Sequence, residues 1–261
     1  MNSETSNAST TALTTGLTGL DNLLGGLRGG SLYAIAGRSS AGKSTLGLGF
    51  ARAVARASNV SCAVFSMQMA NPETILRTVA AESSIRLENL RAQPMALTPD
   101  EQERAERASY LPLMISDTRK ESFEPMLGEC LTIKQDTGLG MVLVDSLDHV
   151  GLDRDGGRDE EASNAQRLKY LARELDVPVV VTVHLDRLSR ELPERPGLWN
   201  LWVSSPVEES SDVVILIDGP SDDTGFPGDE FEVELHVAKN IHGETGTVAA
   251  TRQLQFARFV D

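Results

Sequence analysis

The sequence has few cysteines, few aromatic residues and no long apolar run. Its two cysteines, Cys62 and Cys130, are too few for a disulfide framework, and Cys62 lies in an apolar stretch typical of a buried strand. No stretch reaches the roughly 18 apolar residues that a membrane-spanning helix needs, and the start, MNSETSNASTTA, lacks the basic and apolar parts of a signal peptide. We therefore expect a soluble, cytoplasmic protein with no membrane partner.

Basic residues are also scarce: 24 Lys and Arg stand against 38 Asp and Glu, and the net charge is -14. Non-specific affinity for nucleic acid comes largely from Lys and Arg side chains that release counterions, so binding to DNA would require a local basic surface. Seven carboxylates lie in the segment from Asp218 to Glu234, which contains no Lys or Arg. The simplest interpretation of this segment is a solvated loop and strand.

Six short apolar runs are predicted strands. They cover residues 32–37, 61–67, 111–116, 141–145, 177–183 and 213–218. The runs are continuous rather than alternating and are rich in β-branched residues, which is typical of strands buried on both faces of a parallel sheet. The sequence predicts one α/β domain over residues 14–261, preceded by a disordered polar tail over residues 1–13.

Local signals predict where some of the other elements begin. Residues 98–101 (TPDE) offer a helix cap, a proline in the first turn and a capping-box glutamate, and Ser163 with Gln166 offers a similar start for a second helix. Residues 231–238 (FEVELHVA) alternate between apolar and polar and precede the turn-like HGETG at 242–246. This pattern predicts an antiparallel hairpin at the edge of the sheet.

A glycine-rich loop follows the first predicted strand. GRSSAGKS, from Gly37 to Ser44, matches G-x-x-x-x-G-K-[ST] at every fixed position and precedes a helical pattern. Such a loop points backbone N–H groups at phosphates, while Lys43 supplies a positive charge and the Ser44 hydroxyl a ligand for Mg²⁺. We expect ATP and Mg²⁺ as cofactors. The predicted binding residues are Gly37, Arg38, Ser39, Ser40, Ala41, Gly42, Lys43, Ser44 and Thr45.

Asp145 is the predicted partner of this loop. It ends the apolar run MVLVD, so a second parallel strand would place its carboxylate beside the phosphates. A carboxylate at this place holds a magnesium-bound water in P-loop NTPases. The predicted metal site therefore consists of Ser44 and Asp145.

Several blocks, in order, resemble the C-terminal motor domain of DnaB-type replicative helicases. They are the glycine-rich entry at 15–45, FSMQM at 65–69, VDSLDHV at 144–150, the long block at 167–196, and AKNIHGETGTV with FARF at the end of the chain. The entry alone is also similar to RadA- and KaiC-like ATPases, whereas the later blocks match the helicases. The resemblance implies a RecA-like P-loop fold, with a mostly parallel twisted sheet flanked by helices.

The resemblance also implies catalytic roles, with three departures. Gln68 stands where the family's FSLEM motif has the glutamate that activates water, and a glutamine cannot accept a proton, although some P-loop enzymes orient their water with one. His184 stands at the position of a glutamine that senses the γ-phosphate, and an imidazole can donate to phosphate. The implied catalytic residues are Lys43, Gln68, Asp145 and His184.

The third departure concerns the contact between subunits. In the family, KQR supplies a lysine and an arginine finger to the neighbour's nucleotide, and this chain has Lys239-Asn240-Ile241 there. Lys239 is thus an implied nucleotide-binding residue, while the arginine is replaced by Ile241. His242 and Arg252 are nearby candidates to compensate for its loss.

The resemblance also implies a homo-oligomer, in the family a hexameric ring, around single-stranded DNA. One implied channel loop, residues 151–162, is acidic, and the other, residues 186–206, carries Trp199 and Trp202. These indoles either stack on bases or fill a core or subunit interface.

Two main functions stay open at this stage. One is an ATP-driven DNA helicase or translocase in DNA replication. The other is a weakly hydrolysing, ATP-binding assembly or regulatory subunit, which the changes at Gln68 and Ile241 favour. A RadA- or KaiC-like ATPase is a third alternative.

Overall fold

The structure, a computed structural model, describes residues 12–92, 97–116, 123–150, 158–185, 198, 205–220 and 225–261, apart from the side chains of residues 149, 158–163 and 205. The strands are β1 (Leu32–Gly37), β2 (Ser61–Ser66), β3 (Leu113–Ser116), β4 (Leu139–Asp145), β5 (Val179–His184), β6 (Val213–Asp218), β7 (Glu230–Asn240), β8 (Gly246–Gln253) and β9 (Arg258–Val260). The helices are α1 (Thr18–Leu24), α2 (Lys43–Ser58), α3 (Asn71–Ser83), α4 (Leu87–Ala92), α5 (Pro99–Ser109), α6 (Phe123–Asp136), α7 (Arg158–Leu175) and α8 (Ser205–Ser210), with 3₁₀ turns η2 (Leu147–His149) and η5 (Leu254–Phe256).

The described strands form one sheet in the order β3-β2-β4-β5-β1-β6-β7-β8-β9. All six predicted strands are present, as β1 to β6, and neighbours among them pair in parallel. β1, which leads into the glycine-rich loop, lies between β5 and β6. The predicted α/β class with a mostly parallel sheet is therefore confirmed.

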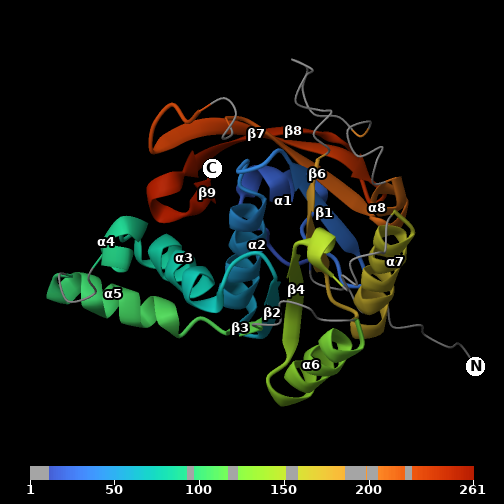
Figure 1. Cartoon of the computed structure of the whole chain (residues 1–261), viewed down its shortest axis with the longest axis horizontal. Coiled ribbons are helices and arrows are strands. Elements are labelled where there is room, and N and C mark those ends of the chain that lie inside the picture. The colour runs from blue at the N-terminus through green and yellow to red at the C-terminus, as the bar shows by residue number, and fades with distance from the viewer. Residues whose placement is uncertain are drawn as a thin grey trace, which may run out of the picture.

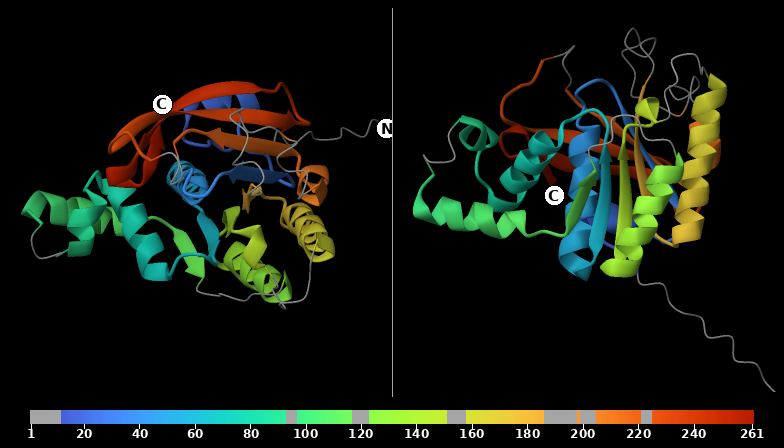
Figure 2. Two further views of the ribbon diagram at one scale, coloured as in Figure 1. Left: turned by 45° about the horizontal axis from the view of Figure 1, so that its top comes forward. Right: turned by 60° about the horizontal axis from the view of Figure 1, so that its bottom comes forward.

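Hydrophobic layers cover both faces of this sheet. On one face, strand residues such as Ala34 and Val181 pack against α6 and α7. On the other, the alternate residues, such as Ile35 and Val180, pack against α1 and α2. Figures 1 and 2 show the helices lying on either side of the strands. Burial on both faces explains why these strands are continuous apolar runs.

The C-terminal strands are antiparallel, as predicted. β7 pairs with β6 and β8, and β9 adds a strand beside β8 at the edge of the sheet. In Figure 1 they arch over α1 and α2. Along β7, exposed Glu230 and Glu232 alternate with buried Phe231 and Val233, so part of the acidic segment is a solvated strand face, as expected. The short β9 was not predicted, because three residues show no clear periodicity.

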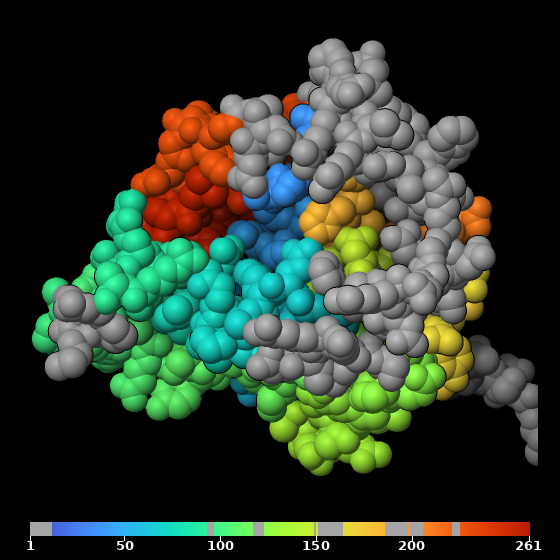
Figure 3. All heavy atoms as spheres, in the orientation of Figure 1, coloured from blue at the N-terminus to red at the C-terminus, as the bar shows by residue number. Residues whose placement is uncertain are grey.

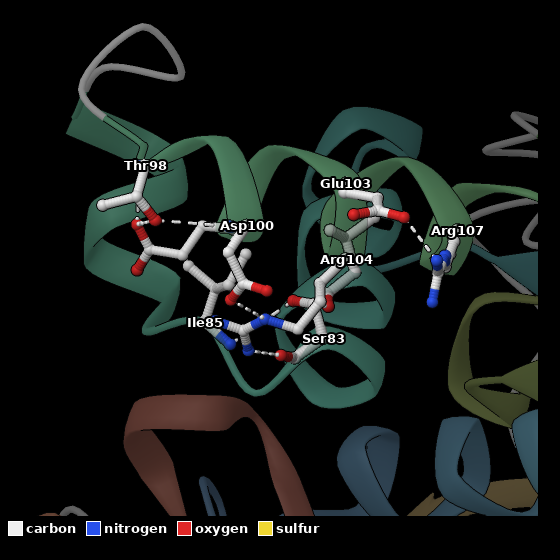
Figure 4. A network of polar contacts seen from close by, with 9 residues as sticks. Ser83, Ile85, Thr98, Asp100, Glu103, Arg104 and Arg107 are labelled. Carbon is white, nitrogen blue, oxygen red and sulfur yellow. Dashed lines mark hydrogen bonds and ion pairs between the residues drawn. The ribbon is translucent and has the colours of Figure 1, made fainter.

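Helices α3, α4 and α5 form a group beside the sheet with a small core of their own, which Figure 2 shows projecting to one side. The capping box predicted at the start of α5 is present, since Glu101 N donates to Thr98 Oγ1 at 3.3 Å and Thr98 N donates to the Glu101 carboxylate at 2.8 Å. Arg104 links α5 to α3 through the backbone oxygen of Ser83 and also pairs with Asp100 at 3.0 Å (Figure 4).

One local prediction is wrong. α7 begins at Arg158, so Ser163 lies inside this helix and does not cap it. The preceding residues, RDEEA, are mostly good helix formers, so the helix extends past the polar cap signal towards its N-terminus.

The predicted polar tail over residues 1–13 lies outside the described residues as far as residue 11. Leu13 is described and pairs with Leu27, with N–O distances of 2.9 and 2.6 Å. Among the described helices, none is long and apolar enough to cross a membrane.

Candidate functional site

The candidate site lies at the carboxyl ends of the parallel strands. The pairing register places Gly37 at the end of β1 opposite His184 at the end of β5, and Ser66 at the end of β2 opposite Asp145 at the end of β4. Gln68 follows β2 by two residues. Four predicted site residues that are distant in sequence thus meet at the carboxyl ends of the strands, the usual position of a ligand in an open α/β fold. They are Gly37, Gln68, Asp145 and His184.

The glycine-rich loop connects β1 to the first turn of α2. Gly42 has a φ of 105°, which strongly favours glycine, and a Cβ there would lie only 2.8 Å from the ring of Phe259. α2 begins immediately afterwards, at Lys43. The loop therefore presents backbone N–H groups and the positive end of a helix dipole to one point, which suits a phosphate group.

Lys43 is buried within this loop. Its Nζ donates to the backbone oxygens of Gly37 at 3.0 Å and Arg38 at 2.8 Å. Burial lowers the pKa of Lys43 to about 8, although the nearby carboxylates Asp145 and Asp148 act in the opposite direction. Among the described residues its hydrogen-bond acceptors are these two carbonyl oxygens, and an anion beside such a buried cation would stabilise it.

Ser44 and Asp145 are in contact, as their predicted shared role requires. Ser44 Oγ donates to Asp145 Oδ1 at 3.0 Å, and Thr182 Oγ1 of β5 donates to the same oxygen at 2.5 Å. The second carboxylate oxygen, Oδ2, is buried and has no hydrogen-bond partner among the described groups. A hydroxyl beside an unpaired carboxylate oxygen fits Mg²⁺ held by Ser44, with Asp145 binding one of its water ligands.

Gln68 and His184 belong to one hydrogen-bonded chain. Gln68 Nε2 donates to Ser146 Oγ at 3.4 Å, and Ser146 Oγ donates to Asp148 Oδ2 at 3.3 Å. The same Asp148 oxygen lies 2.7 Å from His184 Nδ1. Sequence reasoning gave no role to Ser146, Asp148 or Thr182. Thr182 has a visible signal, because it precedes His184 by two residues on a strand and so points to the same side.

Arg252 of β8 contacts the glycine-rich loop from the C-terminal part of the sheet. Its Nη1 donates to the backbone oxygen of Ser40 at 2.6 Å. The guanidinium carbon lies 5.5, 5.8 and 5.9 Å from the ring centroids of Phe226, Phe231 and Phe259, within cation–π range. Arg252 is therefore a member of this site in its own chain.

A pocket of about 430 Å³ adjoins the loop. Its lining includes Lys43, Ser44, Gln68, His184, Arg252 and two further arginines that the sequence analysis did not identify, Arg77 of α3 and Arg91 of α4. Figure 3 shows this face, with the blue atoms of the loop and α2 in a hollow between the red C-terminal strands and the ends of β4 and β5. The size and cationic lining suit a nucleotide.

The residues predicted to act across a subunit contact lie elsewhere. Lys239 Nζ donates to the backbone oxygen of Glu208 in α8 at 2.5 Å, and Ile241 is exposed. His242 Nε2 lies 3.0 Å from Ser31 Oγ, at the end of β1 remote from the loop. Within one chain, none of the three lines the pocket.

The two predicted DNA-channel loops lie mostly outside the part of the chain that the structure describes. Residues 151–157 and 186–197 lie outside the described residues, as do Trp199 and Trp202. The predictions for these loops and both tryptophans stay predictions.

The chain matches known helicases over nearly its whole length. It is 34% identical to the replicative DNA helicase DnaB of Leifsonia xyli subsp. xyli over 97% of this chain and 56% of that protein. It is 30% identical to the replicative DNA helicase DnaB of Geobacillus stearothermophilus over 96% of this chain and 57% of that protein. The chain thus spans little more than half the length of these curated relatives.

Solved structures share the fold. One, an ATPase domain, superposes with a TM-score of 0.86 at 23% identity over 99% of this chain and 94% of that chain. Another is a DnaB-like replicative helicase whose interactions with primase were studied. It superposes with a TM-score of 0.85 at 24% identity, over 98% of this chain and 63% of that chain. The expected RecA-like P-loop fold is confirmed. The family model for the DnaB-like helicase C-terminal domain matches residues 12–261, and the chain therefore belongs to that family.

Proposed function

We propose that this chain is the ATP-hydrolysing motor domain of a replicative DNA helicase, which couples hydrolysis to movement along single-stranded DNA. The observation that carries the proposal is the 3.0 Å contact between Ser44 and Asp145 beside the buried Lys43, in a chain of the DnaB-like family. These are the groups that bind the phosphates and metal in P-loop enzymes.

The proposed cofactors are ATP and Mg²⁺. The loop from Gly37 to Thr45 would bind the phosphates through its backbone N–H groups, with Lys43 as the cation. Ser44 would bind Mg²⁺ directly and Asp145 through a water. The metal would stabilise the charge that develops on the phosphates during transfer. Among the described residues no cluster of three His, Cys, Asp or Glu could hold a metal by itself, in keeping with a magnesium ion that takes most of its ligands from phosphates and water.

The proposed assembly is a homo-oligomeric ring with a nucleotide at each contact between subunits. In this arrangement Lys239 reaches the nucleotide of a neighbouring subunit, which agrees with its absence from the described lining of the pocket in its own chain. Ile241 brings no charge to that contact. Arg252 compensates from within the chain, since it places a cation beside the glycine-rich loop without a partner subunit.

A weakly hydrolysing assembly or regulatory subunit is the alternative. Gln68 favours it, because no carboxylate is among the described residues that line the pocket. The two functions predict different responses to DNA: a motor hydrolyses ATP faster when single-stranded DNA is bound, whereas a regulatory subunit does not. The RadA- or KaiC-like alternative is disfavoured by the family match over residues 12–261.

Light scattering combined with fluorescence anisotropy of labelled single-stranded DNA tests the proposal. With a non-hydrolysable ATP analogue and Mg²⁺, the chain is expected to assemble and to bind the DNA, because nucleotide bound between subunits stabilises the assembled state by linkage. A chain that binds the nucleotide but neither assembles nor binds the DNA would exclude the motor assignment and favour the alternative.

A further inference from the structure

The described lining of the pocket has one candidate proton acceptor. It contains hydroxyl, amide and apolar side chains, Lys and Arg cations, and His184. Gln68 occupies the position where the resemblance places a glutamate, and an amide does not accept a proton at neutral pH. Of the described lining residues, His184 is the one with an imidazole, whose second ring nitrogen can act as a proton acceptor.

His184 is held in the orientation that such a role requires. Its Nδ1 lies 2.7 Å from Asp148 Oδ2, and a carboxylate accepts a hydrogen bond but cannot donate one. The proton of a neutral imidazole therefore resides on Nδ1, and Nε2 is the unprotonated nitrogen that can accept a hydrogen bond or a proton. Asp148 is itself fixed by Ser146 Oγ at 3.3 Å, and Ser146 connects to Gln68 at 3.4 Å.

The position of the pair in the sheet also suits this role. His184 ends β5 directly opposite Gly37, the first residue of the glycine-rich loop, and Asp148 lies in η2, shortly after Asp145 and the end of β4. The ends of β4 and β5 lie side by side next to this loop in Figure 3. The imidazole thus lies on the side of the pocket where the last phosphate of a bound nucleotide is expected, and its partner Asp148 is not among the described lining residues.

We propose that His184 and Asp148 form a proton-accepting pair that replaces the carboxylate absent at Gln68, an inference that rests on the proposed ATP hydrolysis. Gln68 orients the attacking water and His184 Nε2 takes its proton as the water oxygen bonds to the γ-phosphorus. The bond from phosphorus to the bridging oxygen breaks, and its electron pair goes to ADP. Asp148 is a positioning residue that stabilises the imidazolium, and the proton then passes to solvent.

This role differs from that of a γ-phosphate sensor. A sensor must donate a hydrogen bond to phosphate, which a neutral imidazole with its proton on Nδ1 cannot do through Nε2. A glutamine at position 184 would preserve a donor but could not accept a proton. The substitution His184→Gln therefore separates the two roles.

The test measures steady-state ATPase kinetics of the whole chain, with single-stranded DNA present, for the wild type, Asp148→Asn, His184→Gln and each of these combined with Gln68→Glu. In the wild-type background, either single change is expected to lower kcat about tenfold or more, with KM changed by less than about threefold, because a positioned base contributes mainly to the chemical step. In the Gln68→Glu background the same changes are expected to cost less than about threefold, since the introduced carboxylate supplies the base.

Asp100→Asn is the matched control, because it neutralises an exposed carboxylate on α5, away from the pocket. It should leave kcat unchanged. If Asp148→Asn fails to fold, His184→Gln, whose site is at the end of a strand and partly exposed, still decides the question.

If the wild type is active and neither His184→Gln nor Asp148→Asn lowers kcat, the proposed proton-accepting pair is refuted, whereas the proposed motor function is not. Equal losses in the wild-type and Gln68→Glu backgrounds also overturn the pair, because they indicate a structural role. A wild type that binds ATP but does not hydrolyse it overturns both the pair and the motor function.

Discussion

Arg252 Nη1 lies 2.6 Å from the backbone oxygen of Ser40, so a residue of β8 holds the glycine-rich loop from 212 positions further along the chain. Three aromatic rings, of Phe226, Phe231 and Phe259, surround the guanidinium. The contact joins the antiparallel edge of the sheet to the site at the ends of the parallel strands.

Replacing Arg252 is expected to weaken nucleotide binding. Arg252→Ala should raise the Kd for ATP about tenfold, equivalent to about 1.4 kcal/mol, because it removes a charge-assisted hydrogen bond to the loop and a cation beside the phosphates. Arg252→Lys should retain part of the affinity. Fluorescent-nucleotide titration measures the effect, and the exposed Arg107→Ala on α5 is the control. Unchanged affinity in Arg252→Ala would remove Arg252 from the site.

Lys43→Ala is expected to abolish ATP binding without unfolding the domain. The change should weaken binding about 100-fold or more, because a charged hydrogen-bonding partner of the phosphates is lost. The melting temperature without nucleotide should not fall, since burial of the Lys43 charge is unfavourable and its pKa is lowered to about 8. Calorimetric titration and thermal unfolding check the two parts, and wild-type affinity would refute the assignment of the phosphate site.

The sequence alone predicted the parts of the site that depend on local pattern. The glycine-rich loop was identified by its motif, and Asp145 by its position at the end of an apolar run. Their meeting follows from the parallel arrangement of the strands, which the β-branched runs indicated. The contact of Ser44 with Asp145 agrees with the expected position of Asp145 beside the loop, while the site roles of both residues stay proposals.

Contacts that depend on loop conformation and long-range pairing could not be predicted. Asp148 reaches His184 only because the turn η2 directs it towards β5, and no periodicity reveals such a turn. Arg252 was one of two candidates for a missing arginine, and the sequence offered no means of choosing between it and His242. The pairing of the C-terminal strands places Arg252 against Ser40 of the loop and His242 against Ser31, at the other end of β1.

Restoring both residues that differ from the helicase pattern is expected to raise ATP hydrolysis. Gln68→Glu should increase kcat about tenfold, which requires about 1.4 kcal/mol of transition-state stabilisation. The double change with Ile241→Arg should gain more, because the arginine would act on a neighbour's nucleotide from the opposite side. Steady-state kinetics at a concentration that permits assembly measures both. If neither change raises kcat while the wild type hydrolyses ATP rapidly, these residues do not occupy the positions of the base and the finger.

The cysteines are expected to be unreactive in the folded chain. Neither forms a disulfide in the structure and both are fully buried, and burial raises the pKa of the Cys62 thiol to about 12. Since the thiolate is the reactive form, little Cys62 should react with a thiol reagent at a pH of about 8 until the protein unfolds. Labelling followed by mass spectrometry, with and without denaturant, checks this. Rapid labelling of Cys62 in the native protein would show that β2 is not buried within the sheet.

ATP hydrolysis by the wild-type chain, measured with and without single-stranded DNA, tests the proposed motor function most directly. The account predicts Mg²⁺-dependent hydrolysis that single-stranded DNA accelerates, and that Lys43→Ala abolishes in both conditions. Binding of ATP with no hydrolysis, or hydrolysis that single-stranded DNA leaves unchanged, would contradict the motor function and favour a regulatory subunit.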